Sequence, residues 1–300
     1  MRRLNSVARG AAPLVHAVAE MVRESCPELP LSNADARRIV IAGAARVNGR
    51  VVTRPAASLA PGDRLTVSVD ASRLARRRRA QERAVQVLYQ DDHIVAVNKP
   101  PDVPTHATAD SARPHLVGEV ARQLGVNASA IGVHQRLDAG TSGVVLFALT
   151  PEANRGMAKS FADREVEKTY LAIADGQLRP DVVPGTAWVV RGTIAATGSG
   201  RRGRRMIVGA AGQASETAFA ALERRGDRVL LEARPKTGRQ HQIRAHLAAE
   251  RMPILGDGRY GGPPAERLHL HAWRLRLPHP VTGELLLLEG PAPEGWLSRP

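Results

Sequence analysis

The sequence predicts an α+β fold in two parts: a small N-terminal domain with a pair of helices and a few strands, and a larger domain with a mixed, largely antiparallel sheet. The chain has 300 residues, enough for roughly two domains of about 150 residues each. In the larger part, strand and helix patterns follow one another without the regular alternation that is typical of a parallel sheet. We expect the first domain at 1–70, a basic linker at 71–85 and the second domain at 86–300.

Composition and charge narrow the class of protein. With 43% hydrophobic and 24% charged residues, and no run near the roughly 18 apolar residues of a membrane span, we expect a soluble protein that does not bind membranes. The single cysteine, Cys26, excludes an intramolecular disulfide and fits a reducing compartment. We therefore expect a cytoplasmic protein, and a monomer. The net charge of +14 favours a nucleic-acid partner, with a basic surface kept for solubility as the alternative.

Two helices are predicted near the N-terminus. Apolar residues at helical spacing predict the first helix over 12–25. A capping pattern at Ser32 and Asp35 predicts a second helix that continues to Ile41, and Gly43 is placed to end it.

A few short strands are predicted after the helices. Residues 45–52 predict two strands around the turn Asn48-Gly49. The turn residues 61–63 precede a strand in which apolar and polar residues alternate through Val69.

The stretch LSNADARRIVIAGAARVNGRVV, with the later PGDRLTV, resembles the S-four-type RNA-binding domain. The resemblance implies that the helical pair lies along RNA phosphates. Asn33 stands where that family usually carries a basic residue after the capping serine. We therefore expect RNA contact from four arginines, which are Arg37, Arg38, Arg46 and Arg50.

Two charged segments interrupt the pattern of the chain. The run Arg76 to Arg79 predicts an exposed linker. The segment Gly198 to Arg205 is rich in glycine and arginine, which is typical of a loop that either grips phosphates or is disordered. Between them, a strand pair over 87–97 opens the second domain and ends at Lys99.

The sharpest cluster of polar residues is HQRLDAGTSG at 134–143, followed by an apolar strand over 144–148. A carboxylate flanked by an arginine, on a glycine-bounded loop that leads into a strand, is where a fold can display one reactive side chain. From the residues alone, Asp138 can equally pair with Arg136 or cap the next turn.

Within that cluster, RLDAGTSG matches the signature RLDxxTSG and resembles the RluA family of pseudouridine synthases. Further motifs follow in family order over 86–293: NKP at 98–100, REVEKTY at 164–170, TGRQHQIRAH at 237–246, PILGD at 253–257 with Tyr260-Gly261, LHA at 270–272 and PHP at 278–280. Two departures occur. Gln135 replaces the usual histidine, with His134 one place earlier, and Arg251-Met252 replaces a usual glycine-histidine pair.

The resemblance implies an isomerase that converts uridine in RNA to pseudouridine with one catalytic aspartate, Asp138, and no cofactor. It also implies that Arg244 pairs with Asp138 and that Tyr170 receives the flipped base, with a hydroxyl able to take the carbon-5 proton. Arg136 resembles the arginine that fills the gap left in the RNA. The residues expected to contact RNA are Arg136, Lys99, Lys168, Arg239 and the four arginines of the first domain. For Lys99 and Lys168, a role in supporting the site is the alternative.

The reaction breaks the bond from ribose to nitrogen 1 of uracil, turns the base and rejoins ribose to carbon 5. A carboxylate can act as nucleophile at the anomeric carbon or as the base that removes a ribose proton, and either role requires the ionised form. Large-subunit ribosomal RNA is the substrate that the resemblance favours, and transfer RNA is the alternative.

Three other functions are consistent with parts of the sequence. The histidines are consistent with a metal enzyme. In a helix, however, the side chains of His241 and His246 would point in directions roughly 140° apart. His269 and His271 would share one face of a strand, where histidines more often pack or contact RNA than bind metal. A glycosidase needs two carboxylates across the bond, and Asp257, expected to be structural, is the candidate in reserve. A catalytically silent RNA-binding protein fits the charge, but it has no need of the motifs. We expect no metal.

Overall fold

A computed structural model describes residues 2–27, 31, 33–69, 84–107, 114–197, 205–209 and 212–296. The chain divides into two compact units, one within residues 2–69 and the other within 84–106 and 115–296. The predicted linker, including Arg76 to Arg79, lies almost wholly outside the described residues, as do Ser32 and most of the segment Gly198 to Arg205. The assignment of domains and linker therefore stays a prediction.

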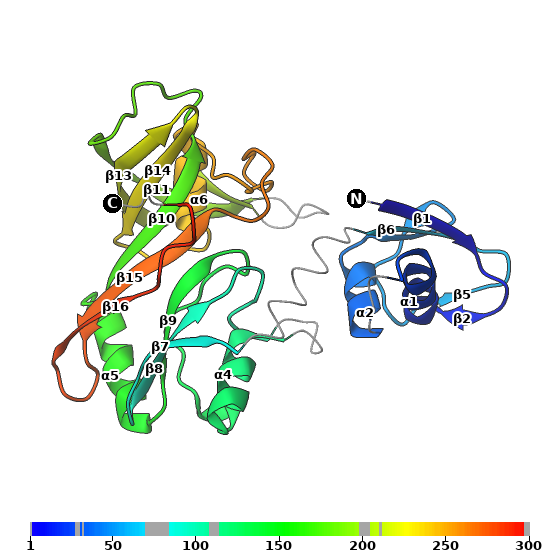
Figure 1. Ribbon diagram of the computed structural model, residues 1–300, viewed down its shortest axis with the longest axis horizontal. Helices are drawn as coiled ribbons and strands as arrows, with labels where there is room; N and C mark the ends of the chain where they lie inside the picture. The colour runs from blue at the N-terminus through cyan, green and yellow to red at the C-terminus, as the bar shows by residue number, and fades with distance from the viewer. Residues whose placement is uncertain are drawn as a thin grey trace. The chain divides into compact units, whose positions relative to one another are not determined.

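The first unit combines two helices with a four-stranded antiparallel sheet in the order β1-β6-β3-β4, and with a two-stranded ribbon of β2 and β5 (Figure 1). Its elements are β1 (Arg2–Val7), β2 (Ala12–Pro13), α1 (Leu14–Ser25), α2 (Asn33–Ile41), β3 (Ala45–Val47), β4 (Arg50–Val51), β5 (Ser58–Leu59) and β6 (Arg64–Val69). The predicted helices and strands are all present. Strand β1 was not predicted, because its residues are mostly polar and exposed and it is defined by its pairing with β6.

One apolar core holds the first unit together. Leu14, Val18 and Val22 of α1 are completely buried, and they belong to the same cluster as Val40 of α2 and Val67 of β6. Apolar burial of this kind is the main favourable contribution to folding. The helical spacing in the sequence thus identified the face that is buried.

The second unit is built on one large, mostly antiparallel sheet. In the described residues the strand order is β12-β11-β13-β14-β10-β15-β9-β8-β7, and β16 pairs with β15. The elements are β7 (Gln86–Gln90), β8 (Ile94–Lys99), α4 (Leu116–Leu124), a 3-10 turn η1 (Ala128–Ala130), β9 (Ser142–Ala148), α5 (Pro151–Ala162), β10 (Glu167–Asp175), β11 (Ala187–Thr197), β12 (Arg205–Gly209), β13 (Gln213–Arg225), β14 (Arg228–Pro235), α6 (Gln242–Ala249), β15 (Leu270–Pro278) and β16 (Leu285–Glu289). The predicted α+β class is confirmed.

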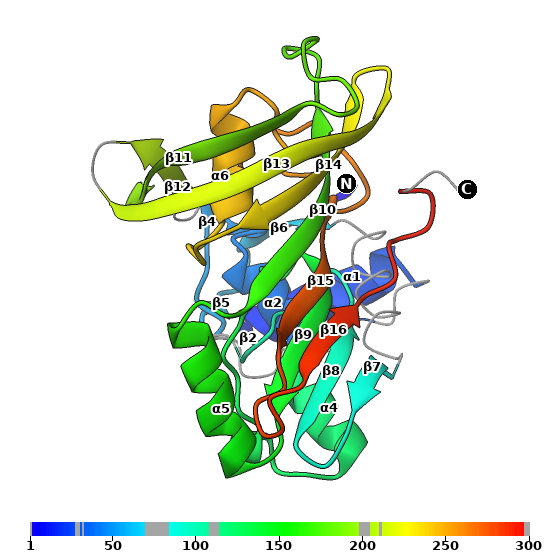
Figure 2. The ribbon, with the colours of Figure 1, turned by 90° about the vertical axis from the view of Figure 1, so that its left-hand side faces the viewer.

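Different helices cover the two ends of this sheet. Helix α6 lies across the part formed by β11, β13 and β14, while α4 and α5 flank the part formed by β7, β8 and β9 (Figure 2). Each half has its own apolar clusters, and Tyr170 on β10 packs against a cluster of each half. Tyr170 therefore lies where the two halves of the core meet.

Strands β9 and β15 pair in parallel, and their close approach requires a glycine. Gly143 pairs with Ala272 and has a φ of +116°. A Cβ at this position would lie 2.1 Å from the carbonyl oxygen of Ala272, so only glycine allows the two backbones to approach this closely. This contact fixes the start of β9, and with it the loop that contains Asp138.

Two of the histidines considered as metal ligands are buried. His246 has hydroxyl partners on both nitrogens, Ser215 and Thr217, each at 2.9 Å. His271 contacts Ser142 at 2.8 Å through Nδ1. Burial lowers the pKa of each histidine to about 4. Both rings are therefore neutral packing groups.

His269 also packs, because it stacks on Trp296 at 5.2 Å between ring centroids. Within the described residues, no group of three or more histidine, cysteine or acidic side chains is placed to hold a metal ion. The helices in the described part of the chain are all too short or too polar to cross a membrane.

The buried histidines predict a loss of stability in acid. In the unfolded chain a histidine has a pKa of about 6.5, so between that value and about 4 the unfolded state binds more protons than the folded state. Stability is therefore complete above pH 6.5 and is lost as the pH falls. For His246, lowering the pH from 7 to 5 costs about 2 kcal/mol.

The measurement is urea unfolding followed by tryptophan fluorescence, since all three tryptophans, Trp188, Trp273 and Trp296, belong to the second unit. The variant His246→Gln keeps hydrogen-bonding groups but cannot take up the proton. It is expected to show a smaller pH dependence than the wild type by about 2 kcal/mol. Equal pH dependence in the two proteins would contradict the assignment.

Candidate active site

Asp138 lies on a loop that is anchored on both sides. On one side, the Thr105 hydroxyl contacts both the N–H and the carbonyl of Leu137, each at 3.1 Å. On the other side, the Lys99 ammonium donates to the carbonyl oxygen of Ala139 at 3.0 Å. Because its two neighbours are held, the backbone of Asp138 has a fixed place and its side chain a fixed direction.

The prediction that Lys99 contacts RNA is wrong. Its side chain is completely buried, and besides Ala139 its ammonium donates to the carbonyl oxygens of Pro100 at 2.9 Å and Val103 at 2.7 Å. A buried ammonium is tolerated only where hydrogen bonds replace its water. Lys99 therefore joins the end of β8 to the loop of Asp138, which is the supporting role that the sequence left open.

Arg244 connects Asp138 to a second carboxylate. Its Nη1 donates to Oδ2 of Asp138 at 2.7 Å, while Nε and Nη2 donate to the two oxygens of Asp257 at 2.7 and 2.8 Å. The predicted pairing of Arg244 with Asp138 is thus present in the structure. Asp257, expected to be structural, is 1% exposed and holds the guanidinium in its plane.

The electrostatics of this cluster keep Arg244 charged. Burial alone would lower its pKa, but the hydrogen-bonded carboxylate of Asp257 and the charge of Asp138 raise it above the ordinary value. The carboxylate of Asp138 is 25% exposed, so it faces solvent. In the described residues its Oδ1 has no hydrogen-bond partner, and this oxygen is available to a substrate.

The start of α6 is fixed by Gln242. Its Oε1 accepts from the Thr237 hydroxyl at 2.7 Å and from the backbone N–H of Arg239 at 3.0 Å. Its Nε2 donates to the Glu216 carbonyl and the Thr217 hydroxyl, both at 2.9 Å. This buried amide thereby ties the loop before α6 to strand β13, and Arg244 follows one half-turn later.

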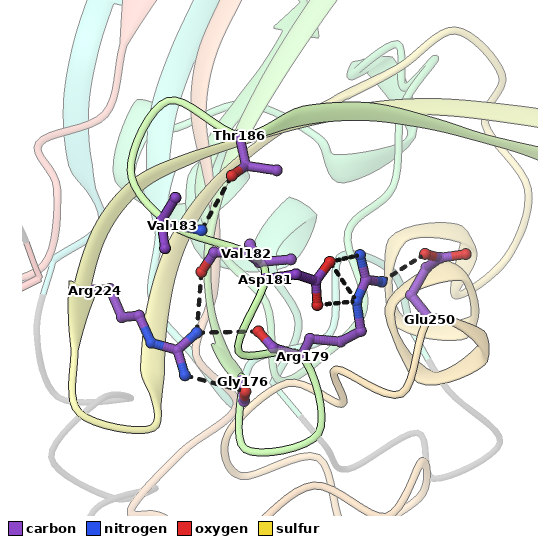
Figure 3. Close-up of polar contacts among 8 residues, drawn as sticks. All are labelled: Gly176, Arg179, Asp181, Val182, Val183, Thr186, Arg224 and Glu250. Carbon is purple, nitrogen blue, oxygen red and sulfur yellow. Dashed lines mark hydrogen bonds and ion pairs between the residues drawn. The ribbon is translucent and has the colours of Figure 1, made fainter.

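The far end of α6 is held by the connection between β10 and β11. Arg179 donates to Glu250 at 3.0 Å and also pairs with Asp181 (Figure 3). The Arg224 guanidinium in turn donates to the carbonyl oxygens of Arg179, Val182 and Gly176 at 3.1, 3.0 and 3.2 Å (Figure 3). Both ends of the helix that carries Arg244 are therefore restrained.

Tyr170 is partly buried on β10, at an irregularity of the pairing between β10 and β15. A register shift of this kind re-aims the side chain that follows it. Burial, and then the charge of Asp138, raise the pKa of its hydroxyl. The structure therefore brings Asp138, Arg244 and Tyr170 into one neighbourhood, and the phenol stays protonated.

His241 and Tyr260 complete the surroundings of Asp138. Nε2 of His241 lies 3.7 Å from Oδ2 of Asp138, and its Nδ1 lies 3.0 Å from the Tyr260 hydroxyl. The Tyr260 ring also lies beneath the Arg244 guanidinium, 5.1 Å from ring centroid to carbon. The sequence indicated these two residues only as a metal alternative and as a motif position, although their place in the motifs was the available signal.

Other predicted residues of the second unit lie at or near its surface. Arg136 is exposed, and Arg239 is partly exposed, with its Nε donating to the Ala214 carbonyl at 3.0 Å. The Lys168 ammonium lies 5.0 Å from the centre of the Phe161 ring, and burial lowers its pKa. Their contact with RNA stays a prediction.

Gln135, the departure from the family pattern, is buried beside Arg136. Its Nε2 has no hydrogen-bond partner among the described residues. Nothing in the structure explains this substitution.

The four arginines of the first unit differ in their surroundings. Arg37 and Arg50 are exposed. Arg38 pairs with Asp35 at 2.6 Å, and Arg46 donates to the Gly49 carbonyl at 3.2 Å. The contact of these four arginines with RNA stays a prediction.

The geometry decides between one and two reactive carboxylates. Both oxygens of Asp257 are occupied by Arg244, and its side chain is buried, so it cannot serve as the second acid of a glycosidase. What remains is one partly exposed aspartate, with an oxygen that has no hydrogen-bond partner among the described residues, an aromatic ring nearby and the guanidinium of Arg244 against its other oxygen. This arrangement fits a reaction at a carbon that develops positive charge.

Replacing Asp257 by asparagine is expected to slow the reaction, although the Asp257 side chain does not contact the substrate. The variant Asp257→Asn leaves a buried guanidinium with one fewer charge partner, so the unfolding free energy falls by about 3 kcal/mol. Because Arg244 is then free to turn away from Asp138, kcat falls at least about tenfold.

The matched control is Asp181→Asn, which removes a carboxylate that is 61% exposed from the Arg179 pair. Exposed pairs contribute about 1 kcal/mol or less, so this variant is expected to resemble the wild type. Equal effects of the two substitutions on kcat would contradict the assignment of Asp257.

The chain is similar in sequence and in structure to known proteins. The family described as RNA pseudouridylate synthase matches residues 93–249. Ribosomal large subunit pseudouridine synthase C of Escherichia coli (strain K12) is 33% identical over 282 residues, covering 86% of this chain and 84% of that protein. Ribosomal large subunit pseudouridine synthase D of Vibrio cholerae is 29% identical over 276 residues, covering 85% of this chain and 82% of that protein. The solved structure of human RNA pseudouridylate synthase domain containing 1 superposes with a TM-score of 0.57 at 27% identity, covering 70% of this chain and 84% of that one.

Proposed function

The chain belongs to the RNA pseudouridylate synthase family and is therefore an isomerase, and we propose that it converts specific uridines of large-subunit ribosomal RNA to pseudouridine with Asp138 as the reactive carboxylate. One observation carries the assignment of Asp138. Its carboxylate is held by Arg244 at 2.7 Å through one oxygen, while the other oxygen has no partner in the described residues.

The proposed reaction needs an ionised carboxylate beside the anomeric carbon. The bond from ribose to nitrogen 1 of uracil breaks, and the electron pair leaves with the uracil ring as a delocalised anion. The ring turns, carbon 5 forms the new bond to ribose, and the proton on carbon 5 is lost while nitrogen 1 takes up a proton, so that the product is an isomer of the substrate. Asp138 acts either as nucleophile at the anomeric carbon or as base at the ribose, and in both roles the hydrogen bond from Arg244 directs the carboxylate.

Tyr170 receives the flipped base through its ring. The alternative role, accepting the carbon-5 proton, is disfavoured because burial raises the pKa of this hydroxyl and a protonated phenol is a weak acceptor. Leaving the RNA stack costs the base a few kcal/mol, which stacking on an aromatic face offsets. Exposed Arg136 is placed beside Asp138 in the chain, and we assign to it the space that the uridine leaves.

The choice of ribosomal RNA rests on the named relatives. Two curated relatives are ribosomal large subunit pseudouridine synthases, and the chain covers more than four-fifths of each. The net charge of +14 supports a polyanionic substrate. Transfer RNA remains the alternative substrate, and mapping pseudouridines in RNA from cells without this protein distinguishes the two. We also propose a cytoplasmic monomer.

For the first unit we propose an S-four-type RNA-binding role. Its helical pair α1 and α2 and its short strands support this role, as do the exposed side chains of Arg37 and Arg50. Because Asp35 already neutralises part of the charge of Arg38, that residue contributes less to phosphate binding than the other three.

Replacing Asp138 by asparagine is expected to abolish isomerisation and leave RNA affinity nearly unchanged. The variant Asp138→Asn removes the reactive charge and little volume. The measurements are tritium release from carbon 5 of labelled uridine in ribosomal RNA, and a filter-binding Kd. As control, Asp227→Asn makes the same change at an exposed turn. Turnover of Asp138→Asn within tenfold of wild type, a barrier change of only about 1.4 kcal/mol, would refute the role.

We expect weaker RNA binding when four arginines of the full chain, Arg37, Arg38, Arg46 and Arg50, are changed to serine. The affinity of this variant for RNA should also depend less steeply on salt concentration. Each phosphate contact contributes about −0.9 to the slope of log K against log salt on duplex and about −0.7 on single strands. The slope should therefore become shallower by about two units or more, while kcat at saturating RNA stays the same.

The matched control for this prediction is the set of arginine-to-lysine changes at the same four positions, which keeps the charge. Equal slopes for the serine variant and the wild type would show that the first unit does not bind RNA through these arginines.

A further inference from the structure

His241 is, after Arg244, the second side chain that faces Oδ2 of Asp138. It lies immediately before α6 in a left-handed backbone conformation, with φ of 54°. A non-glycine residue in this conformation is strained, and such strain is kept only where the surroundings enforce it. Here the following residue, Gln242, enforces it through its four hydrogen bonds.

The two neighbours of the ring, Tyr260 and Asp138, favour one tautomer of His241. The Tyr260 hydroxyl accepts from the backbone N–H of Met206 at 3.0 Å and lies 3.0 Å from Nδ1 of His241. In the tautomer that suits both neighbours, Nδ1 accepts from the phenol. The ring proton then resides on Nε2, which faces Oδ2 of Asp138 at 3.7 Å. The opposite tautomer would point a nitrogen lone pair at a carboxylate, which is electrostatically unfavourable.

Burial favours the neutral form of the ring. It lowers the pKa of His241; the carboxylates of Asp138 and Asp257 act in the opposite direction, and the guanidinium groups of Arg244 and Arg259 reinforce the lowering. A neutral ring can donate to Asp138 without adding a second positive charge beside Arg244.

Resting on the proposed function, we propose that His241 is a positioning residue for Asp138. In the RNA complex its Nε2–H donates to Oδ2, so that His241 and Arg244 share this oxygen and Oδ1 is turned toward the ribose. Tyr260 acts through His241 by fixing the tautomer. The present separation of 3.7 Å is longer than a hydrogen bond, and contacts of this kind commonly shorten when the substrate is bound.

Four variants of the full chain test the proposal: His241→Phe, His241→Gln, Tyr260→Phe and the double variant His241→Phe/Tyr260→Phe. Glutamine matters most, because its amide carries an acceptor and a donor at nearly the separation of the two ring nitrogens. It can accept from Tyr260 and donate to Asp138 but cannot titrate. The readouts are kcat and KM for pseudouridine formation in ribosomal RNA.

The expected result is a loss in kcat of about tenfold or more for His241→Phe, with KM for RNA unchanged, because the contact aligns the carboxylate and not the RNA. His241→Gln should recover most of the loss. Tyr260→Phe should lose less than His241→Phe, and the double variant should be no slower than His241→Phe alone, since the hydroxyl acts through the ring.

Three results would overturn the proposal: wild-type kcat in His241→Phe, equal losses in the phenylalanine and glutamine variants, or additive losses in the double variant. The control is His93→Gln, a histidine beside β8 at the end remote from Lys99, which should have wild-type kcat. Circular dichroism checks the fold, and the comparison of glutamine with Tyr260→Phe remains decisive if His241→Phe does not fold. Absence of pseudouridine from the wild-type reaction would refute the proposed function itself.

Discussion

The site depends on one buried cation. The guanidinium of Arg244 is buried, and burying a charge costs several kcal/mol unless an opposite charge compensates it. Asp257 accepts two hydrogen bonds, from Nε and Nη2, and Nη1 donates to Asp138. The buried carboxylate of Asp257 thus sets the direction from which Arg244 contacts the more exposed carboxylate of Asp138. A guanidinium held at two edges has a fixed plane, and the oxygen that it contacts is fixed with it.

Around this ion pair, buried polar side chains hold the backbone. Lys99 ties β8 to the Asp138 loop, and Gln242 ties β13 to the start of α6. Gly143 lets β9 and β15 approach at the point where that loop enters the sheet. The two side chains hold these segments through hydrogen bonds to backbone carbonyl oxygens. The reactive loop is consequently rigid although it has no regular secondary structure.

Much of the fold and part of the site could be predicted from the sequence. The apolar stripe of α1, the hairpin of β3 and β4 and the alternation in β6 are local patterns, and the structure contains them. Strand β1 escaped prediction because its polar residues are held by β6, a partner far along the chain. The RluA-type motifs identified Asp138 and Arg244 and implied their pairing. Lys99 was misassigned to RNA, since the spacing of a lysine in a motif does not reveal its burial.

By itself, the sequence predicted which residues make up the site and most of the segments that form helices or strands, because side-chain type and periodicity are local properties. Only the tertiary structure decided how the polar groups are used. Asp257 became the holder of Arg244, and His241 came to face Asp138 rather than a metal ion. The reason is that burial and charge compensation depend on segments from separate strands and loops meeting in space, and no local pattern specifies which donor reaches which oxygen.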